Sequence, residues 1–237
     1  MTKNASLFRS LFVSAAAAAL ALPLLAAGFN LNAPGRTDAD HDRDAYNKPV
    51  ELFEFWGIRE GTRIMDLFPG DGYTTLLYSL AVGPKGKVLA FGSYDHETFE
   101  KRMKPLNLTN VDETVLKEPE GFTTLTKELA KIPAGSLDGV YTIRNYHDLK
   151  HPPEVLAELK RILKPGGVLG IADSRTTSGR DIDNHRIADD VIIREVTTAG
   201  FTLAGVSQML SNGKDDYTKG FWNERFIVDQ SCLKFTR

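Results

Sequence analysis

The run Arg144–Asp148 carries the side chains best suited to acid–base chemistry in this 237-residue sequence. The reference pKa of histidine lies near neutrality, so His147 is a candidate general base. Either Asp148 or Asp173 would orient its ring, and Arg144 would hold an anionic substrate through paired hydrogen bonds. In the alternative interpretation, His147 only caps a loop and the arginine is solvated. The candidate catalytic residues are therefore Arg144, Asn145, His147, Asp148 and Asp173.

The same segment has a spacing of histidines that a metal site could use. His147 and His151 are four residues apart with Asp148 between them, which is the spacing of two ligands on one helix face. Pro152 follows at once, and the residue before a proline avoids helical geometry, so the two rings need not face the same way. The single cysteine, Cys232, provides no cluster for zinc. We therefore expect no metal site from these residues.

A second candidate site is the stretch DLFPGDGYTT, Asp66 to Thr75, which has the pattern of a strand that turns on glycines into a helix. A phosphate-binding P-loop requires G-x-x-x-x-G-K-[ST], and the stretch does not match it. A dinucleotide turn requires G-x-G-x-x-G, in which Gly70 and Gly72 fill the first two places but Thr75 stands in the third. A plain strand-to-helix turn without a ligand is the other possibility.

Five short apolar segments alternate with helical segments around these two sites, which predicts a doubly wound, mostly parallel sheet covered on both faces. Two further strands follow each other without an intervening helix, so they predict an antiparallel hairpin at the sheet edge, giving a seven-stranded α/β fold. The carboxyl ends of parallel strands share one edge, where ligands bind. The predicted strands are 63–68, 87–91, 111–116, 137–143, 168–173, 201–210 and 223–235, and the predicted helices are 46–57, 73–82, 96–103, 123–131, 153–163 and 185–199.

The order of elements and the glycine turn resemble the class I S-adenosylmethionine-dependent methyltransferases, over about residues 46–235. In the family motif [DE]-x-G-x-G-x-G, Asp66, Gly70 and Gly72 match, while Phe68 replaces the first glycine. The segment SLDGVYTIRNYHDL resembles the family's fourth strand and its following loop, and LKRILKPGGVLGIAD, the most specific match, resembles its next helix, turn and strand. The whole is similar to a group of exported bacterial predicted methyltransferases.

The resemblance implies S-adenosylmethionine as the cofactor. The turn glycines would let the backbone approach its amino acid end, Asp66 would attract the ammonium, and the ring of Tyr73 would face the sulfonium. The family's ribose-binding carboxylate aligns with Gly92, and Asp95 would either reach the ribose or cap the next helix. Glu118 is a candidate for the adenine amino group. The cofactor-binding residues implied are Asp66, Phe68, Gly70, Asp71, Gly72, Tyr73, Ser93, Asp95 and Glu118.

The composition predicts the setting of this domain. A formal net charge of -2 gives no electrostatic footprint for nucleic acid. Residues 1–28 have a basic start, an alanine-rich apolar run and small residues near Gly28, which is the pattern of a signal peptide, with an uncleaved anchor as the alternative. We therefore expect a signal peptide over 1–28, a linker over 29–44, a methyltransferase-like domain over 45–237, a periplasmic or secreted location and no membrane association after cleavage.

Two functions remain open from the sequence. The first is an S-adenosylmethionine-dependent methyltransferase that acts on an unknown, small acceptor. The second is a non-catalytic or repurposed protein of the cell envelope that uses the same fold to bind a small ligand. Export favours the second, because S-adenosylmethionine is made inside the cell and a protein exported unfolded arrives without it. The sequence does not predict the oligomeric state.

Overall fold

The computed structural model describes residues 29–93, 95–116, 121–222 and 226–237. The predicted signal peptide and the candidate Glu118 lie outside these residues. In the described part of the chain, no helix has both the length and the apolar character needed to cross a bilayer.

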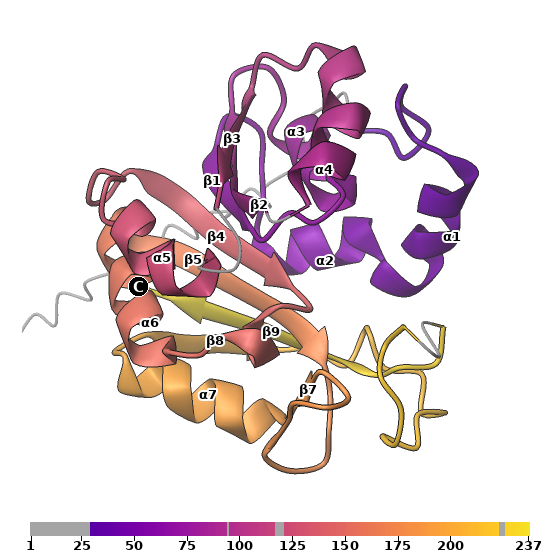
Figure 1. Cartoon of the computed structure of the whole chain (residues 1–237), viewed down its shortest axis with the longest axis vertical. Helices are drawn as coiled ribbons and strands as arrows, with labels where there is room; N and C mark the ends of the chain where they lie inside the picture. The colour runs from indigo at the N-terminus through magenta and orange to yellow at the C-terminus, as the bar shows by residue number, and fades with distance from the viewer. Residues whose placement is uncertain (1–28, 94, 117–120, 223–225) are drawn as a thin grey trace, which may run out of the picture.

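A seven-stranded sheet with the order β3-β2-β1-β4-β5-β9-β8 forms the centre of the molecule (Figure 1). The first five strands are parallel, and β9 runs antiparallel to both β5 and β8. The predicted fold class is thus confirmed. The bounds are β1 Arg63–Leu67, β2 Lys87–Ser93, β3 Val111–Val115, β4 Leu137–Ile143, β5 Leu163–Ser174, β8 Thr202–Val206 and β9 Gln230–Thr236.

Helices cover both faces of this sheet. The side chains of α5, α6 and α7 pack in one apolar cluster with β1, β4 and β5, while those of α2 and α3 pack on the opposite face. Helix α4 packs beside α3 over β2. The bounds are α1 Asp38–Asn47, α2 Pro49–Trp56, α3 Tyr73–Val82, α4 His96–Met103, α5 Gly121–Leu129, α6 Pro152–Ile162 and α7 Asp189–Thr198; the single-turn 3₁₀ helices η1 and η2 are Lys104–Leu106 and Tyr146–Asp148.

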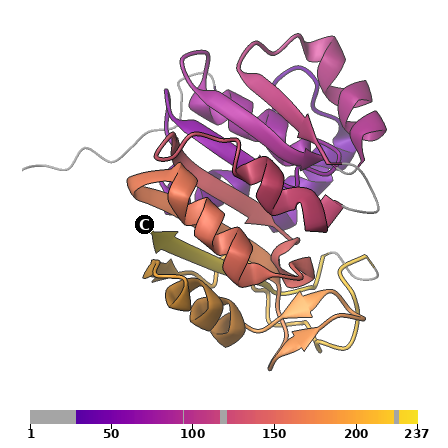
Figure 2. The same ribbon diagram turned by 60° about the vertical axis from the view of Figure 1, so that its left-hand side comes forward.

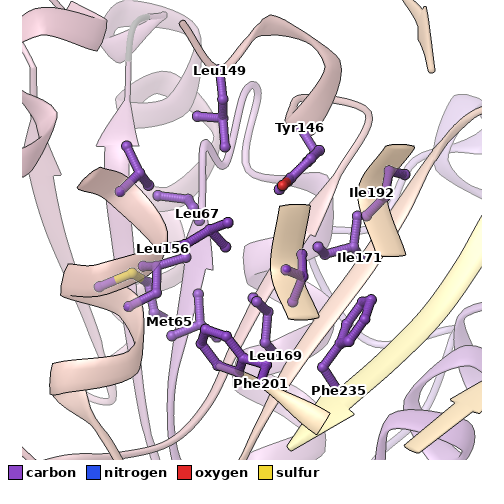
Figure 3. Packing of buried hydrophobic residues seen from close by; sticks show 14 of the residues in the cluster. Met65, Leu67, Tyr146, Leu149, Leu156, Leu169, Ile171, Ile192, Phe201 and Phe235 are labelled. Carbon is purple, nitrogen blue, oxygen red and sulfur yellow. The ribbon is translucent and has the colours of Figure 1, made fainter. Parts of the chain in front are cut away.

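The alternation of side chains along β1 explains the two layers. Met65 and Leu67 point into the cluster under α6, where they meet Leu156 and Leu169 (Figure 3). Asp66, the residue between them, points the other way, because successive strand residues face opposite sides of a sheet. Asp66 therefore faces α3, at the end of an otherwise apolar strand.

Several segments differ from the prediction. The expected helix 46–57 is divided at Lys48 between α1 and α2, and β5 begins at Leu163 instead of residue 168. The expected strand 201–210 ends at Val206, and the expected strand 223–235 begins only at Gln230. Residues 38–44 of the expected linker form most of α1, which begins at a capping box: Thr37 accepts a hydrogen bond from the backbone of Asp40, and the Asp40 carboxylate accepts one from the backbone of Thr37. The expected helix 185–199 begins only at Asp189, because the residues before it form a small hairpin of β6, Arg180–Asp181, and β7, Arg186–Ile187. Figure 2 shows this hairpin beside the yellow segment that precedes β9.

Candidate functional site

The turn between β1 and α3 has a left-handed backbone at three positions. Phe68 has φ +65°, Gly70 φ +55° and Gly72 φ +81°. A Cβ atom at Gly70 would find no described atom within 4 Å, so the turn is open on this side. A Cβ atom at Gly72 would lie 3.2 Å from Met103 and Phe99 of α4. Gly70 is thus the glycine that borders free space, whereas Gly72 is required by the packing of α4.

Asp66 is buried beneath this turn. Its Oδ2 accepts hydrogen bonds from the hydroxyls of Thr74, at 3.0 Å, and Thr75, at 2.6 Å. Burial raises the pKa of Asp66 to about 6, although the two hydroxyls oppose the shift. The carboxyl group therefore fastens the first turn of α3 to the end of β1. Its predicted contact with the cofactor ammonium stays a prediction.

Tyr73 and Asp71 have their strongest interactions with the N-terminal segment. The guanidinium of Arg43 lies 3.9 Å from the centre of the Tyr73 ring, and the Tyr73 hydroxyl donates to Asp44 at 2.7 Å. Asp71 accepts from Arg43 at 2.6 Å and from Arg102 at 3.3 Å. Burial alone would raise the pKa of Asp71. The two arginines outweigh burial, so the pKa of Asp71 is lower than its ordinary value. Tyr73 thus already carries a cation on its ring, and its expected role beside the sulfonium stays a prediction.

The end of β2 departs from the family pattern for a steric reason. Gly92 has φ +86°, and a Cβ atom there would lie 2.9 Å from the ring of Phe68 and 3.4 Å from Leu116. The ring of Phe68 therefore occupies the space that a side chain at position 92 would need, and a carboxylate there is excluded. Asp95 accepts a hydrogen bond from the backbone of Thr98 and is the N-cap of α4, so the helix-capping alternative holds.

Ser93 is the remaining polar candidate at this strand end. Its side chain is buried, and its hydroxyl has no hydrogen-bond partner within the described ranges. Because a buried hydroxyl without a partner is costly, such a group is suited to receive a ligand atom. Of Ser93 and Asp95, the two polar residues expected near the ribose, only Ser93 has a side chain without a hydrogen-bond partner in the described structure.

His147 lies in η2, directly after β4, and is held by a fully buried carboxylate. Asp173, at the end of β5, accepts from the backbone N–H of His147 at 2.9 Å and from its Nδ1 at 2.7 Å. On its other side, Nε2 faces Asp148 Oδ2 at 3.2 Å and His185 Nδ1 at 3.0 Å. The structure thus brings His147, Asp148 and Asp173 together as predicted, with Asp173 as the residue that orients the ring.

The charge state of His147 differs from the expectation. Burial lowers its pKa, but the carboxylates of Asp173 and Asp148 outweigh burial and raise the pKa to about 9. An imidazole with this pKa keeps its proton at neutral pH, so it is a weak proton acceptor there. The role of His147 as a base stays a prediction.

The two other candidates in this loop have structural partners. Arg144 donates to Asn47 Oδ1 at 2.8 Å and Gln230 Oε1 at 3.0 Å, and its guanidinium lies 4.2 Å from the centre of the Phe221 ring. Burial lowers the pKa of Arg144 to about 10. Asn145 donates to the backbone oxygen of Phe68 at 3.3 Å, and so ties the end of β4 to the glycine turn. These contacts make both residues parts of the frame around the site.

The segment 211–222, which lies between the last two predicted strands, contributes to the site. Phe221 lies under Arg144, and the ring of Trp222 meets His185 edge-on, with ring centres 4.7 Å apart. Arg186 anchors the segment through two hydrogen bonds to Asp215, at 2.7 and 3.0 Å. No local spacing in the sequence links these residues to His147.

Comparisons with known proteins find methyltransferases. The family described as "Methyltransferase domain" matches residues 104–171. The ubiquinone/menaquinone biosynthesis C-methyltransferase UbiE of Pseudomonas putida is 29% identical over 181 residues, and that of Ectopseudomonas mendocina is 25% identical over 184 residues. These alignments cover 76% of this chain and 65% of each relative.

Solved structures share the fold. A SAM-dependent methyltransferase from Aquifex aeolicus has a TM-score of 0.63 and 21% identity, covering 82% of this chain and 92% of that one. The [4+2]-cyclase SpnF has a TM-score of 0.61 and 15% identity, covering 91% of this chain and 88% of that one. At such identities the likeness concerns the fold alone, and the cyclase illustrates that one fold can host different chemistry.

Proposed function

This chain belongs to the class I S-adenosylmethionine-dependent methyltransferase superfamily, and we propose that it binds this cofactor at the β1–α3 turn and methylates a small acceptor. The observation that carries the proposal is the open space beside Gly70, at φ +55°. The turn lies where the strand order reverses, between β1 and β4, which is the crevice in which open α/β sheets bind ligands.

The residues of the turn fit the amino acid end of the cofactor. Gly70 leaves room for close approach of a ligand to the backbone, and the Asp66 carboxyl lies directly beneath the start of α3. On the nucleoside side, Gly92 offers no carboxylate, and the buried Ser93 hydroxyl is the available polar group. The cofactor supplies an electrophilic methyl group, and the residues of this chain supply position and shape.

Methyl transfer needs two reactants held in line, so positioning is the main task of the protein. Asn145 fixes the turn to the end of β4, and Asp173 fixes the ring of His147. The acceptor would then lie beside η2, near Trp222 and Ile182, whose side chains are exposed. Exposed apolar side chains next to this edge favour an apolar, small-molecule acceptor. The relatives' names, which concern C-methylation in ubiquinone and menaquinone biosynthesis, are compatible with that class.

Replacement of Gly70 by asparagine tests the proposal. Asparagine tolerates a left-handed backbone, so Gly70→Asn should fold, while its side chain enters the space intended for the ligand. We expect the affinity for S-adenosylmethionine to fall at least tenfold, which corresponds to about 1.4 kcal/mol. Calorimetric titration of the purified full chain measures it.

The matched control is Gly135→Asn. Gly135 has φ +61°, and a Cβ atom there would also meet no atom of the described residues within 4 Å. Gly135 precedes β4 and so lies at the opposite edge of the sheet from the turn. This variant should bind the cofactor like the unmodified chain. Equal affinities of the two variants would contradict a cofactor site at the turn.

We also propose that the domain acts outside the cytoplasm, on the grounds of the composition of residues 1–28. Mass spectrometry of the protein from its native host should then find a chain that starts near Phe29. Recovery of an intact chain from the cytoplasm would contradict export.

A further inference from the structure

Three side chains from two distant segments direct their donor atoms at one point beside η2. They are His147 Nε2 and Asp148 Oδ2, from η2, and His185 Nδ1, from the turn between β6 and β7. The distances are 3.0 Å between the two imidazole nitrogens, 3.2 Å from His147 to Asp148 and 3.3 Å from His185 to Asp148. We propose that these three residues bind one divalent transition-metal ion, with zinc as the best match.

The distances agree with the coordination geometry of zinc. Zinc binds imidazole nitrogen and carboxylate oxygen at about 2.0–2.2 Å, and two ligands of a tetrahedral ion at that range are roughly 3.3–3.6 Å apart. The three observed separations lie at or slightly below this range, so small shifts would admit the ion. Two histidines and one carboxylate are a donor set typical of zinc and other first-row metals. The set leaves a fourth position for water or a substrate atom.

The buried Asp173 provides the outer support that a metal-binding histidine needs. It accepts a hydrogen bond from His147 Nδ1 at 2.7 Å, which keeps one ring proton on Nδ1, so that a bound ion would displace the proton from Nε2 and take the lone pair of that nitrogen. Asp173 is itself fixed, because it also accepts from the backbone N–H groups of His147, at 2.9 Å, and Ser174, at 2.8 Å. The metal-facing tautomer of His147 is thus set by the fold.

His185 has a left-handed backbone in the turn that joins β6 and β7. Its backbone has φ +52°, in the left-handed region that costs a residue other than glycine on the order of 1 kcal/mol. The strained turn points the imidazole toward η2, and the edge of Trp222 packs against the ring. In the sequence, only His151 has the spacing of a second ligand beside His147, and no metal site is expected from that pair. The structure instead places His151 at the exposed N-cap of α6, and His185 faces His147.

The site is reachable and its charge is balanced. The side chains of Asp148 and His185 are 34% and 42% exposed, so an ion and a fourth ligand can enter from solvent. The carboxylates of Asp148 and Asp173 together match a double positive charge. The nearby Arg180, which donates to the backbone oxygen of His147, is paired with Glu195 at 3.0 Å. Its charge is therefore largely neutralised.

The metal proposal does not rest on the cofactor proposal, since its ligands lie on η2 and the β6–β7 turn and its readout needs no S-adenosylmethionine. The full chain, produced without a histidine tag and stripped with a chelator, is titrated with Zn²⁺ in competition with a chromophoric chelator. We expect one Zn²⁺ per chain and a rise in Tm. Co²⁺ should give the intense visible absorption of a tetrahedral site.

His185→Gln is the decisive variant, because the side chain is half-exposed and its loss should not prevent folding. The Kd of this variant for Zn²⁺ should rise more than roughly 100-fold. Loss of a residue that only supports a metal ligand usually raises the Kd by no more than that. Asp148→Asn provides a second variant with the same expectation. The matched control, His151→Gln, should bind like the unmodified chain. Absence of stoichiometric binding in the unmodified chain, or unchanged binding in His185→Gln and Asp148→Asn, overturns the proposal.

Discussion

Arg186→Met should lower the free energy of unfolding by about 3–5 kcal/mol, the usual cost of removing one partner from a buried ion pair. Arg186 is fully buried and makes four hydrogen bonds: two to Asp215, and one each to the backbone oxygens of Arg175 and Lys219. Methionine preserves the length of the side chain but leaves the buried Asp215 carboxylate without its counter-charge. Urea denaturation followed by circular dichroism measures the loss.

The control for this prediction is Arg194→Met on the surface of α7. Arg194 and its partner Asp190 are both largely exposed, and their closest N···O distance is 3.7 Å, so the pair should contribute no more than about 1 kcal/mol. If the two variants have the same stability, Arg186 does not anchor the segment 211–222. Limited proteolysis distinguishes global unfolding from release of that segment alone, which should expose a cleavage site near Lys214 or Lys219.

Asp66→Asn should stabilise the cofactor-free protein at neutral pH while weakening cofactor binding. The pKa of Asp66 is about 6 in the folded chain, against 3.8 ordinarily, so the folded state favours the neutral carboxyl. The unmodified chain therefore loses stability as the pH rises from about 4 to about 6, and the loss is constant above that. A shift of this size corresponds to about 3 kcal/mol. Asparagine is neutral throughout and should avoid the loss.

The measurement is the difference in unfolding free energy between Asp66→Asn and the unmodified chain, at pH 4.5 and pH 7.5. At pH 7.5 the variant should gain unfolding free energy relative to the unmodified chain, compared with pH 4.5. The other titrating groups are the same in both proteins, so their contributions cancel in the difference. Asp95→Asn is the control, since asparagine caps a helix as well as aspartate does and Asp95 is exposed. A pH-independent difference for Asp66→Asn would show that the carboxyl is not destabilised by burial.

The sheet and its covering helices were predictable because each depends on local pattern. Strands of five to twelve residues are separated by helices with their own apolar faces, and only one kind of layered fold buries both. The strand alternation that puts Met65 and Leu67 in one cluster also sends Asp66 to the opposite face. The placement of His147 and Asp173 at one edge followed from the parallel order alone.

The partners of the site residues were not predictable, because they depend on contacts between distant segments. Tyr73 and Asp71 meet arginines from a region that the sequence presented as a linker. His185 meets His147 only because two short strands turn the chain back toward η2. In each case the decisive neighbour is 28 or more residues away, at a distance where neither periodicity nor spacing carries information.

The contact between Phe68 and Gly92 has a consequence for how such a chain can change. Gly92→Asp alone would force a side chain against an aromatic ring at 2.9 Å on a left-handed backbone. Phe68→Gly alone would empty a buried aromatic volume, which costs about 3–5 kcal/mol. Each single step is harmful and only the two together restore the common motif, so the positions show strong epistasis. The two residues should therefore change together and not one at a time.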